Sequence, residues 1–343
     1  MKRGFVERNA SLVPDSLLVL RRNKLIEQFD SFGVEAVIIY GDVADADELH
    51  YFVNLAPYWF SATSVIGKDG SQSIIAGMTA RVNFWIAQMS GVDKSLVNGA
   101  GPAVNKELVK YLEGRYAQGS KIGMVGDYFP LEMQNAIEAA GFTTVWMTDA
   151  ARAIVTTQDG GFKDTLEKGI ELMNGALHKT LAEVKNGQTM QSIAADAEYA
   201  CRSAGAMDVL ILAGDKNFGL CKALDAPAAE PWTLFVLLQY LGQWLIIVRN
   251  SDPGLNNEAF DRRNACLQKL KPGKQPAVFH DGPWSFELCP MVRSDHAAYV
   301  ASGELELSLN QIISLRASNK DKGIVIEDMV LISSDKAGLL TGI

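Results

Sequence analysis

The sequence TLFVLLQYLGQWLIIVR, from Thr233 to Arg249, is the longest apolar stretch of the chain. Gln239, Gly242 and Gln243 interrupt it, so it does not supply the roughly 20 consecutive apolar residues that a membrane span requires. Its aromatic and branched side chains are typical of buried strands. We therefore expect a strand-rich second half and no membrane-spanning segment.

Helices are expected just before this strand-rich region. Apolar residues spaced three or four apart from Leu166 to Val184 form one face of a long amphipathic helix. Asn186–Gly187 ends this helix, and Thr189 is well placed to cap a second one that runs to Gly205. Further short strands are expected at 209–214, 311–315 and 323–333.

The first half alternates between predicted helices and strands. Val34–Tyr40 is almost continuously apolar, as in a strand that is covered on both faces. Ala62–Ile66 and Ser73–Ala76 flank a turn that contains Asp69–Gly70, which predicts a β-hairpin. Helices are expected at 17–32, 106–113 and 130–140, and strands at 51–53, 121–125 and 143–147. The pattern indicates an α/β domain with a mixed sheet flanked by helices.

A linker divides the chain into two predicted domains. Thr156–Gly161 (TTQDGG) is rich in the residues that favour loops. A length of 343 residues suits two domains. We place the first domain at 1–157 and the second at 158–343.

Charge and cysteine usage limit the classes of function. The net charge is −8 and no dense run of Lys and Arg follows Arg21–Arg22, which argues against nucleic-acid binding. The four cysteines contain no CxxC pair, and 1–8 do not resemble a secretory signal. We therefore expect a cytoplasmic protein with reduced thiols. G-x-S-x-G, P-loop and G-x-G-x-x-G phrases are absent from the sequence, so serine hydrolase, NTPase and dinucleotide-binding functions have no support.

Several short phrases of the second half occur in a characteristic order. They are VKNGQT at 184–189, LKPG at 270–273, LNQIIS at 309–314, GIVIEDMVLI at 323–332 and LLTG at 339–342. Together they resemble the "pita-bread" domain of the creatinase, prolidase and aminopeptidase P family. His50–Phe52 and the hairpin Val65–Gly70 are similar to that family's N-terminal domain. The resemblance implies an α+β pita-bread domain after the α/β domain, shortened after residue 273.

The same resemblance implies that the family's metal site is lost. Active peptidases of this fold hold two divalent ions with two Asp, one His and two Glu. Alignment by spacing places Phe235 and Ile246 at the aspartate positions and Arg316 at the first glutamate position. Residues 284–288 replace the strand that supplies the histidine, and only Glu327 remains. We therefore expect neither a metal ion nor another cofactor.

Three residues are candidates for metal-free catalysis, because creatinase hydrolyses without metal in the same pocket. Cys221 falls at the family's histidine position and is either a nucleophile or a small buried side chain. His296 is either a proton shuttle, with Asp295 fixing its tautomer, or a surface residue. Glu327 is either a general base or the partner of a buried arginine in an ion pair.

Four further residues are expected to bind a ligand in this pocket: Arg249, Arg316, Trp244 and Glu287. Either Arg316 or Arg249 is the expected ion-pair partner of Glu327. A separate aromatic group, Tyr58–Phe60 with Trp85, is interpreted as core, with a ligand or dimer surface as the alternative.

The predicted function is therefore that of a non-catalytic or metal-independent relative of Xaa-Pro peptidases and creatinase. Such a protein would bind a small ligand in the degenerate pocket, or a partner subunit as a homodimer or with an active paralogue. The first alternative is a metal-free hydrolase that cleaves a C–N bond in a small amide or amidine. The second is an Xaa-Pro dipeptidase with unusual metal ligands.

Overall fold

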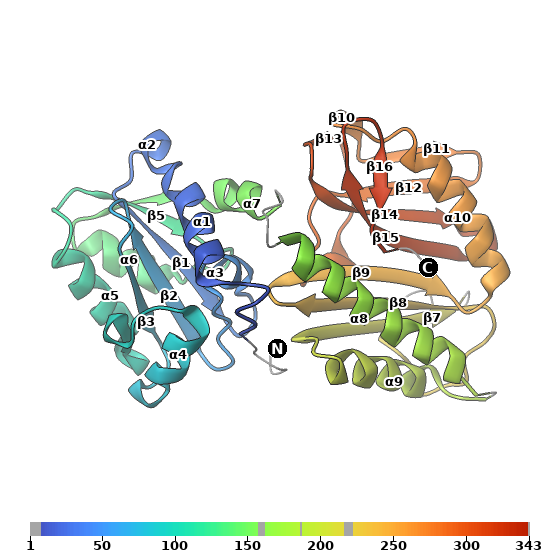
Figure 1. Cartoon of the computed structure of the whole chain (residues 1–343), viewed down its shortest axis with the longest axis horizontal. Helices are drawn as coiled ribbons and strands as arrows, with labels where there is room; N and C mark the ends of the chain where they lie inside the picture. The colour runs from blue at the N-terminus through green and yellow to red at the C-terminus, as the bar shows by residue number, and fades with distance from the viewer. Residues whose placement is uncertain (1–7, 157–161, 186, 216–221, 342–343) are drawn as a thin grey trace. The chain divides into compact units, whose positions relative to one another are not determined.

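A computed structural model of the chain describes residues 8–156, 162–185, 187–215 and 222–341 (Figure 1). The chain forms two compact units, Met1–Val155 and Thr156–Ile343. The boundary predicted between 157 and 158 lies outside the described residues.

The first unit is built on a mixed six-stranded sheet in the order β4-β3-β2-β1-β5-β6. Its strands are β1 (Ala36–Asp42), β2 (Ser61–Gly67), β3 (Gln72–Ala76), β4 (Val97–Gly99), β5 (Lys121–Val125) and β6 (Thr143–Trp146). β1 pairs antiparallel with β2 and parallel with β5. The predicted hairpin is present as β2 and β3. A mixed sheet flanked by helices, as predicted, is confirmed.

Helices cover this sheet. They are α1 (Asp15–Ile26), α2 (Phe29–Phe32), α3 (Asp47–Val53), α4 (Asn83–Ser90), α5 (Val104–Glu113), α6 (Leu131–Ala139) and α7 (Thr148–Val155). Two predictions are wrong here. The single helix expected at 17–32 is two helices, and 51–53, expected as a strand, is the end of α3. A short apolar run that is buried on all sides has no period that separates helix from strand.

The aromatic group Tyr58–Phe60 was interpreted as core, and the structure corrects this. Tyr58, Trp59 and Phe60 are 37%, 50% and 57% exposed. They lie in the connection between α3 and β2, where Trp59 stacks on Phe60 and Tyr58 packs edge-on against Trp85. These aromatic side chains therefore pack against one another at the surface and not in a core.

The second unit contains an eight-stranded sheet in the order β11-β12-β14-β15-β9-β8-β7, with β16 paired to β15. Its strands are β7 (Asp208–Asp215), β8 (Trp232–Tyr240), β9 (Gln243–Asn250), β11 (Val278–Asp281), β12 (Trp284–Cys289), β14 (Ile312–Asn319), β15 (Ile324–Ile332) and β16 (Ala337–Leu339). A separate two-stranded sheet joins β10 (Gly273–Pro276) to β13 (Glu304–Leu307).

The apolar stretch Thr233–Arg249 forms the hairpin of β8 and β9 at the middle of this sheet. The turn consists of Leu241 and Gly242, whose φ values are +45° and +86°. Two consecutive residues with positive φ make the tight hairpin turn whose twist matches that of the strands. Glycine adopts this conformation without steric strain, whereas Leu241 adopts it at an energetic cost.

Three helices lie across one face of the sheet: α8 (Phe162–Glu183), α9 (Met190–Ser203) and α10 (Pro253–Leu267) (Figure 1). The predicted cap of α9 is present, because the Thr189 side chain accepts a hydrogen bond from the backbone N–H of Ser192. The sequence did not predict α10. Its buried positions include the polar Asn256 and Arg263, so the helix shows no clear apolar face. No helix in the described part of the chain has both the length and the apolar character to cross a membrane.

Candidate functional site

One row of directly opposed residues crosses the sheet of the second unit. From β7 to β11 the row reads Leu212, Phe235, Val248, Glu327, Arg316, Glu287 and Val278. Residues paired in this way project from the same face of a sheet. The neighbouring Asp328 projects to the other face, where it meets Arg263 of α10. The row therefore lies on the face opposite α10, and its apolar and charged halves meet at Glu327.

Glu327 is enclosed by hydrogen-bond donors. Its exposed fraction is 1%. Oε1 accepts a hydrogen bond of 2.6 Å from Ser314 Oγ and lies 2.6 Å from His296 Nε2. Oε2 accepts a hydrogen bond of 3.0 Å from Arg316 Nε. Of the two arginines expected as its partner, Arg316 forms the ion pair.

These donors determine the charge state of the carboxyl group. Burial on its own would raise the pKa of Glu327. The charge and hydrogen bond of His296, the charge of Arg316 and the hydrogen bond from Ser314 outweigh burial and lower this pKa to about 2. Glu327 is therefore ionised near neutral pH, and both of its oxygens are occupied.

His296 begins the short 3-10 turn η4 (His296–Ala298), and its exposed fraction is 2%. The alternative of a surface histidine is therefore wrong. Glu327, rather than Asp295, holds the imidazole, and Tyr299 stacks against it with ring centroids 6.1 Å apart. The other ring nitrogen, Nδ1, is buried and has no hydrogen-bond partner among the described residues.

Arg316 connects the buried cluster to the surface. Its Nη1 donates to Glu287 Oε2 at 3.3 Å, and the side chains of Arg316 and Glu287 are 22% and 31% exposed. Burial alone would lower the pKa of Arg316, but the neighbouring carboxylates Glu327 and Glu287 raise it. Two of the residues expected to bind a ligand, Arg316 and Glu287, thus adjoin the two catalytic candidates His296 and Glu327.

Cys221 is the one cysteine that the sequence offered as a catalytic candidate. Cys221 lies outside the described residues. Cys289 is buried beside the cluster, opposite Ser314 on the neighbouring strand. Burial raises the pKa of Cys289 to about 12, and its Sγ donates to the carbonyl of Met291 at 3.1 Å. Cys289 is therefore a neutral thiol near neutral pH.

The structure does not place Arg249 with the cluster. Its Nη2 donates to Asp328 Oδ1 at 2.5 Å on the helix-covered face of the sheet. Arg263 pairs with the second oxygen of Asp328, and both guanidinium groups contact the ring of Phe260. Burial lowers the pKa of Arg249, although Asp328 opposes this effect. Arg249 consequently contributes to the packing of α10 rather than to a ligand site.

Trp244 is also separate from the cluster. It pairs with Gln239 near the hairpin turn, four residues along β9 from Val248. At about 3.4 Å per residue, this places it about 14 Å from the row. Ile246, at a predicted aspartate position, is fully buried and opposes Leu237.

A pocket of about 430 Å³ adjoins the cluster on the same face of the sheet. Arg316, Ser318 and Lys320 line it on one side. Apolar side chains that include Leu212 and Phe235 line the other. The charged row therefore borders a cavity of a size suited to a small molecule.

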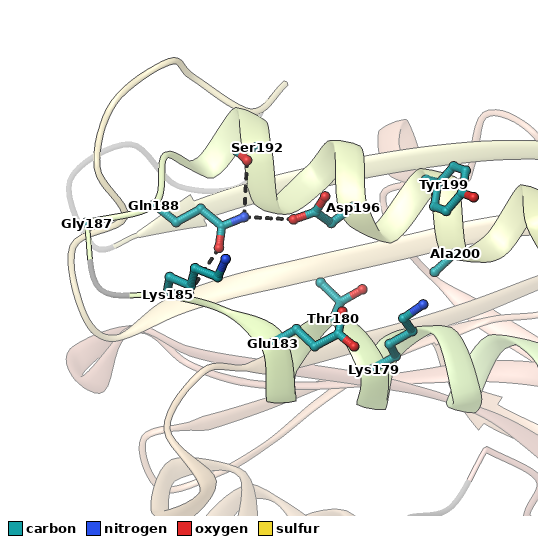
Figure 2. Close-up of a pocket in the computed structure, with 10 residues that line it drawn as sticks. All are labelled: Lys179, Thr180, Glu183, Lys185, Gly187, Gln188, Ser192, Asp196, Tyr199 and Ala200. Carbon is teal, nitrogen blue, oxygen red and sulfur yellow. Dashed lines mark hydrogen bonds between the residues drawn. The ribbon is translucent and has the colours of Figure 1, made fainter.

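A second pocket, of about 920 Å³, lies between α8 and α9 (Figure 2). The side chain of Gln188 lies at one end of this pocket, where its Nε2 donates to Ser192 Oγ at 3.1 Å and to Asp196 Oδ2 at 2.7 Å. Gln188 Oε1 accepts a hydrogen bond from the backbone N–H of Lys185 at 3.1 Å. The pocket is polar, and the side chain of Gln188 is already hydrogen-bonded, so we regard the Glu327 face as the candidate site.

The donors on that face do not fit the paired metal ions that the family resemblance implies. Three protein donors occupy the oxygens of Glu327, and Arg316 separates Glu327 from Glu287. Across the described ranges, no three His, Cys, Asp or Glu side chains converge in a group that could hold a metal ion.

Comparison with known proteins identifies the fold. No protein-family model and no curated sequence matches the chain. Solved structures do match along almost its whole length. The X-Pro aminopeptidase of Thermotoga maritima has a TM-score of 0.73 at 16% identity, covering 94% of this chain and 97% of that one. The chain has the creatinase/prolidase fold.

Two further structures of this fold agree. The prolidase of Pyrococcus horikoshii has a TM-score of 0.72 at 17% identity and covers 94% of this chain and 98% of its own. The Xaa-Pro dipeptidase of Bacillus anthracis has a TM-score of 0.71 at 13% identity, with 95% and 98% covered. The predicted creatinase/prolidase fold class, with its pita-bread second domain, is confirmed. At these identities the likeness concerns the fold alone.

Sequence reasoning missed Ser314 and Cys289. A usable signal was present for Ser314, because it precedes Arg316 by two residues in a strand and so projects from the same face. Cys289 gave no such signal, because only the pairing of β12 with β14 brings it beside Ser314.

Proposed function

We propose that this chain binds a small ligand on the Glu327 face and does not hydrolyse peptides with a metal ion. The observation that carries this proposal is that both carboxylate oxygens of Glu327 already accept hydrogen bonds from protein donors. A carboxylate that bridges metal ions needs free oxygen lone pairs, whereas His296, Ser314 and Arg316 already donate to both oxygens of Glu327. Arg316 also places a positive charge where a cation would be repelled.

The apolar half of the row supports the same proposal. Val248 lies directly opposite Glu327, Phe235 is the next residue of the row, and Ile246 lies two residues before Val248 on β9; all three are buried. None of these side chains offers a metal ligand or a group that transfers a proton. Together with the adjoining pocket they form an apolar surface beside a charged one, which is the usual composition of a small-molecule site.

A second candidate function, metal-free cleavage of a C–N bond, is favoured by His296. Its buried Nδ1 has no hydrogen-bond partner among the described residues, and Glu327 holds the ring through Nε2. An imidazole oriented by a carboxylate is suited to general acid or base catalysis, which contributes roughly 10²–10⁴-fold in rate. In this function Glu327 is a positioning residue for His296.

Hydrolysis of Xaa-Pro dipeptides tests the proposal. The purified chain is assayed with added Mn²⁺ or Co²⁺ beside Glu327→Gln and the exposed control Glu306→Gln. We expect no hydrolysis above the Glu327→Gln background. Metal-dependent hydrolysis that Glu327→Gln abolishes and Glu306→Gln retains would contradict the proposal. Hydrolysis of small amides that survives a chelator and disappears in His296→Gln would favour the second candidate.

A further inference from the structure

The pocket beside Arg316 has one side rich in hydrogen-bond donors. Arg316 and Ser318 occupy alternate positions of β14 and so share a face, and Lys320 follows directly after the strand. All three line the pocket of about 430 Å³. The side chains of Ser318 and Lys320 make no hydrogen bond or ion pair with another described residue, although their backbones are hydrogen-bonded.

Arg316 retains donor capacity despite its two ion pairs. A guanidinium carries five N–H groups. Its Nε donates to Glu327 and its Nη1 to Glu287, and these are its hydrogen bonds within the described chain. The N–H groups of Nη2 are therefore available. Because Arg316 is partly exposed, a ligand can reach them without displacing Glu327.

The other side of the pocket is mainly apolar. Leu212 and Phe235 line it together with Thr233, and Val325 lies beside Ser318 on the neighbouring strand. Asp215 also lines the pocket, but it already has an interaction of its own. A ligand that fits must combine an acceptor group for the donors with an apolar body of modest size.

We infer that the pocket binds a small carboxylic acid with an apolar body. The carboxylate accepts hydrogen bonds from Arg316 Nη2 and Ser318 and is attracted by Lys320, while the body packs on Phe235 and Leu212. Arginine suits such a site because its planar fork matches a carboxylate. This inference deepens the proposed function and rests on it.

Calorimetric titration with a matched pair of probes tests the inference. The acid is 4-phenylbutyrate, and its neutral counterpart is 4-phenylbutyramide. We expect the acid to bind the full chain at least about tenfold more tightly than the amide, which is the scale of a charge-assisted contact. Equal affinities, or binding of neither probe, would overturn the inference.

Charge reversal locates the carboxylate. Lys320 is exposed and outside the ion pairs of Glu327, so Lys320→Glu is expected to fold normally. It should weaken binding of the acid about tenfold and leave the amide unchanged, whereas the exposed control Lys336→Glu should alter neither affinity. An unchanged affinity for the acid in Lys320→Glu would place the probe elsewhere and overturn the inference.

Different results would overturn the proposed function and the carboxylate site. Xaa-Pro hydrolysis that depends on metal and on Glu327 would overturn the proposed function and, with it, this inference. If that activity is absent and the acid does not outbind the amide, the inference alone is overturned.

Discussion

Glu327 and Asp328 are consecutive residues of β15, and both carboxylates are buried. Their side chains point to opposite faces of the sheet. Asp328 is enclosed by two buried arginines, Arg249 and Arg263, and by Thr341. Glu327 is held by His296, Ser314 and Arg316, and Arg316 continues to the partly exposed Glu287. The Asp328 cluster is closed on all sides, whereas the Glu327 cluster opens toward a pocket.

This difference is why we treat the Asp328 cluster as structural and the Glu327 cluster as the candidate site. Both satisfy their carboxylates, so burial and pairing alone do not distinguish them. The Asp328 cluster joins β9, β15 and α10 to Thr341, and Asp328 itself is fully buried. The Glu327 cluster joins strands to the η4 turn and leaves donors directed at a cavity.

The largest expected effect comes from Asp328→Ala. The substitution leaves the charges of Arg249 and Arg263 buried without a partner, which should lower the free energy of unfolding by about 3–5 kcal/mol. Urea unfolding measures the loss, with the exposed Asp321→Asn as control. A loss of less than about 1 kcal/mol, as at an exposed ion pair, would contradict a structural role.

Glu327→Gln should have a smaller effect, about 2–3 kcal/mol at neutral pH. The charged hydrogen bonds weaken, but Arg316 is 22% exposed and keeps its ion pair with Glu287. The same urea experiment compares the two variants. If Glu327→Gln lowered the free energy of unfolding more than Asp328→Ala does, the comparison would be contradicted, because the Glu327 cluster would then stabilise the fold more than the Asp328 cluster.

The pH dependence of this loss sharpens the comparison. The pKa of Glu327 is lowered in the folded chain to about 2, from an ordinary value of about 4.5 in the unfolded chain. Its contribution to stability is therefore complete above about pH 4.5 and lost as the pH falls toward about 2. The difference between the wild type and Glu327→Gln should close over this interval. A difference that stays constant would mean that the carboxylate is not stabilised as described.

Ser314→Ala should have the smallest effect, about 1 kcal/mol, because it removes one hydrogen bond to Glu327 Oε1 and leaves the other donors. The exposed Ser308→Ala is the control. The substitution should also shift the acid limb of the stability curve upward, since the hydrogen bond from Ser314 lowers the pKa of Glu327. An unchanged acid limb would argue against this hydrogen bond.

Much of the fold followed from local patterns. The apolar stripe of α8, the cap at Thr189 and the β2–β3 hairpin depend on residues close in sequence. The predictions failed where burial removes the pattern. Residues 51–53 are buried on all sides within a helix, and α10 buries Asn256 and Arg263. In those segments tertiary contacts, rather than periodicity, determine the structure.

The candidate site was predictable only in part. Arg316 and Glu327 lie inside β14 and β15, and their pairing follows from the register of these two strands. The contact between His296 and Glu327 joins a turn to a strand, which no local pattern marks. The sequence suggested Asp295, the residue before His296, as the partner of the imidazole, and this was wrong. Arg249 was assigned to the wrong face of the sheet. It follows Val248 on β9, so alternation along the strand directs the two side chains to opposite faces.

The central claim is that protein donors, rather than metal ions, satisfy Glu327. The most direct test is the metal content of the purified full chain, expressed in medium supplemented with Mn, Co, Zn and Fe. The account predicts less than about a tenth of an ion per chain, since a carboxylate already held by three donors offers no site. A content of about one or two ions per chain, lost in Glu327→Gln, would contradict it.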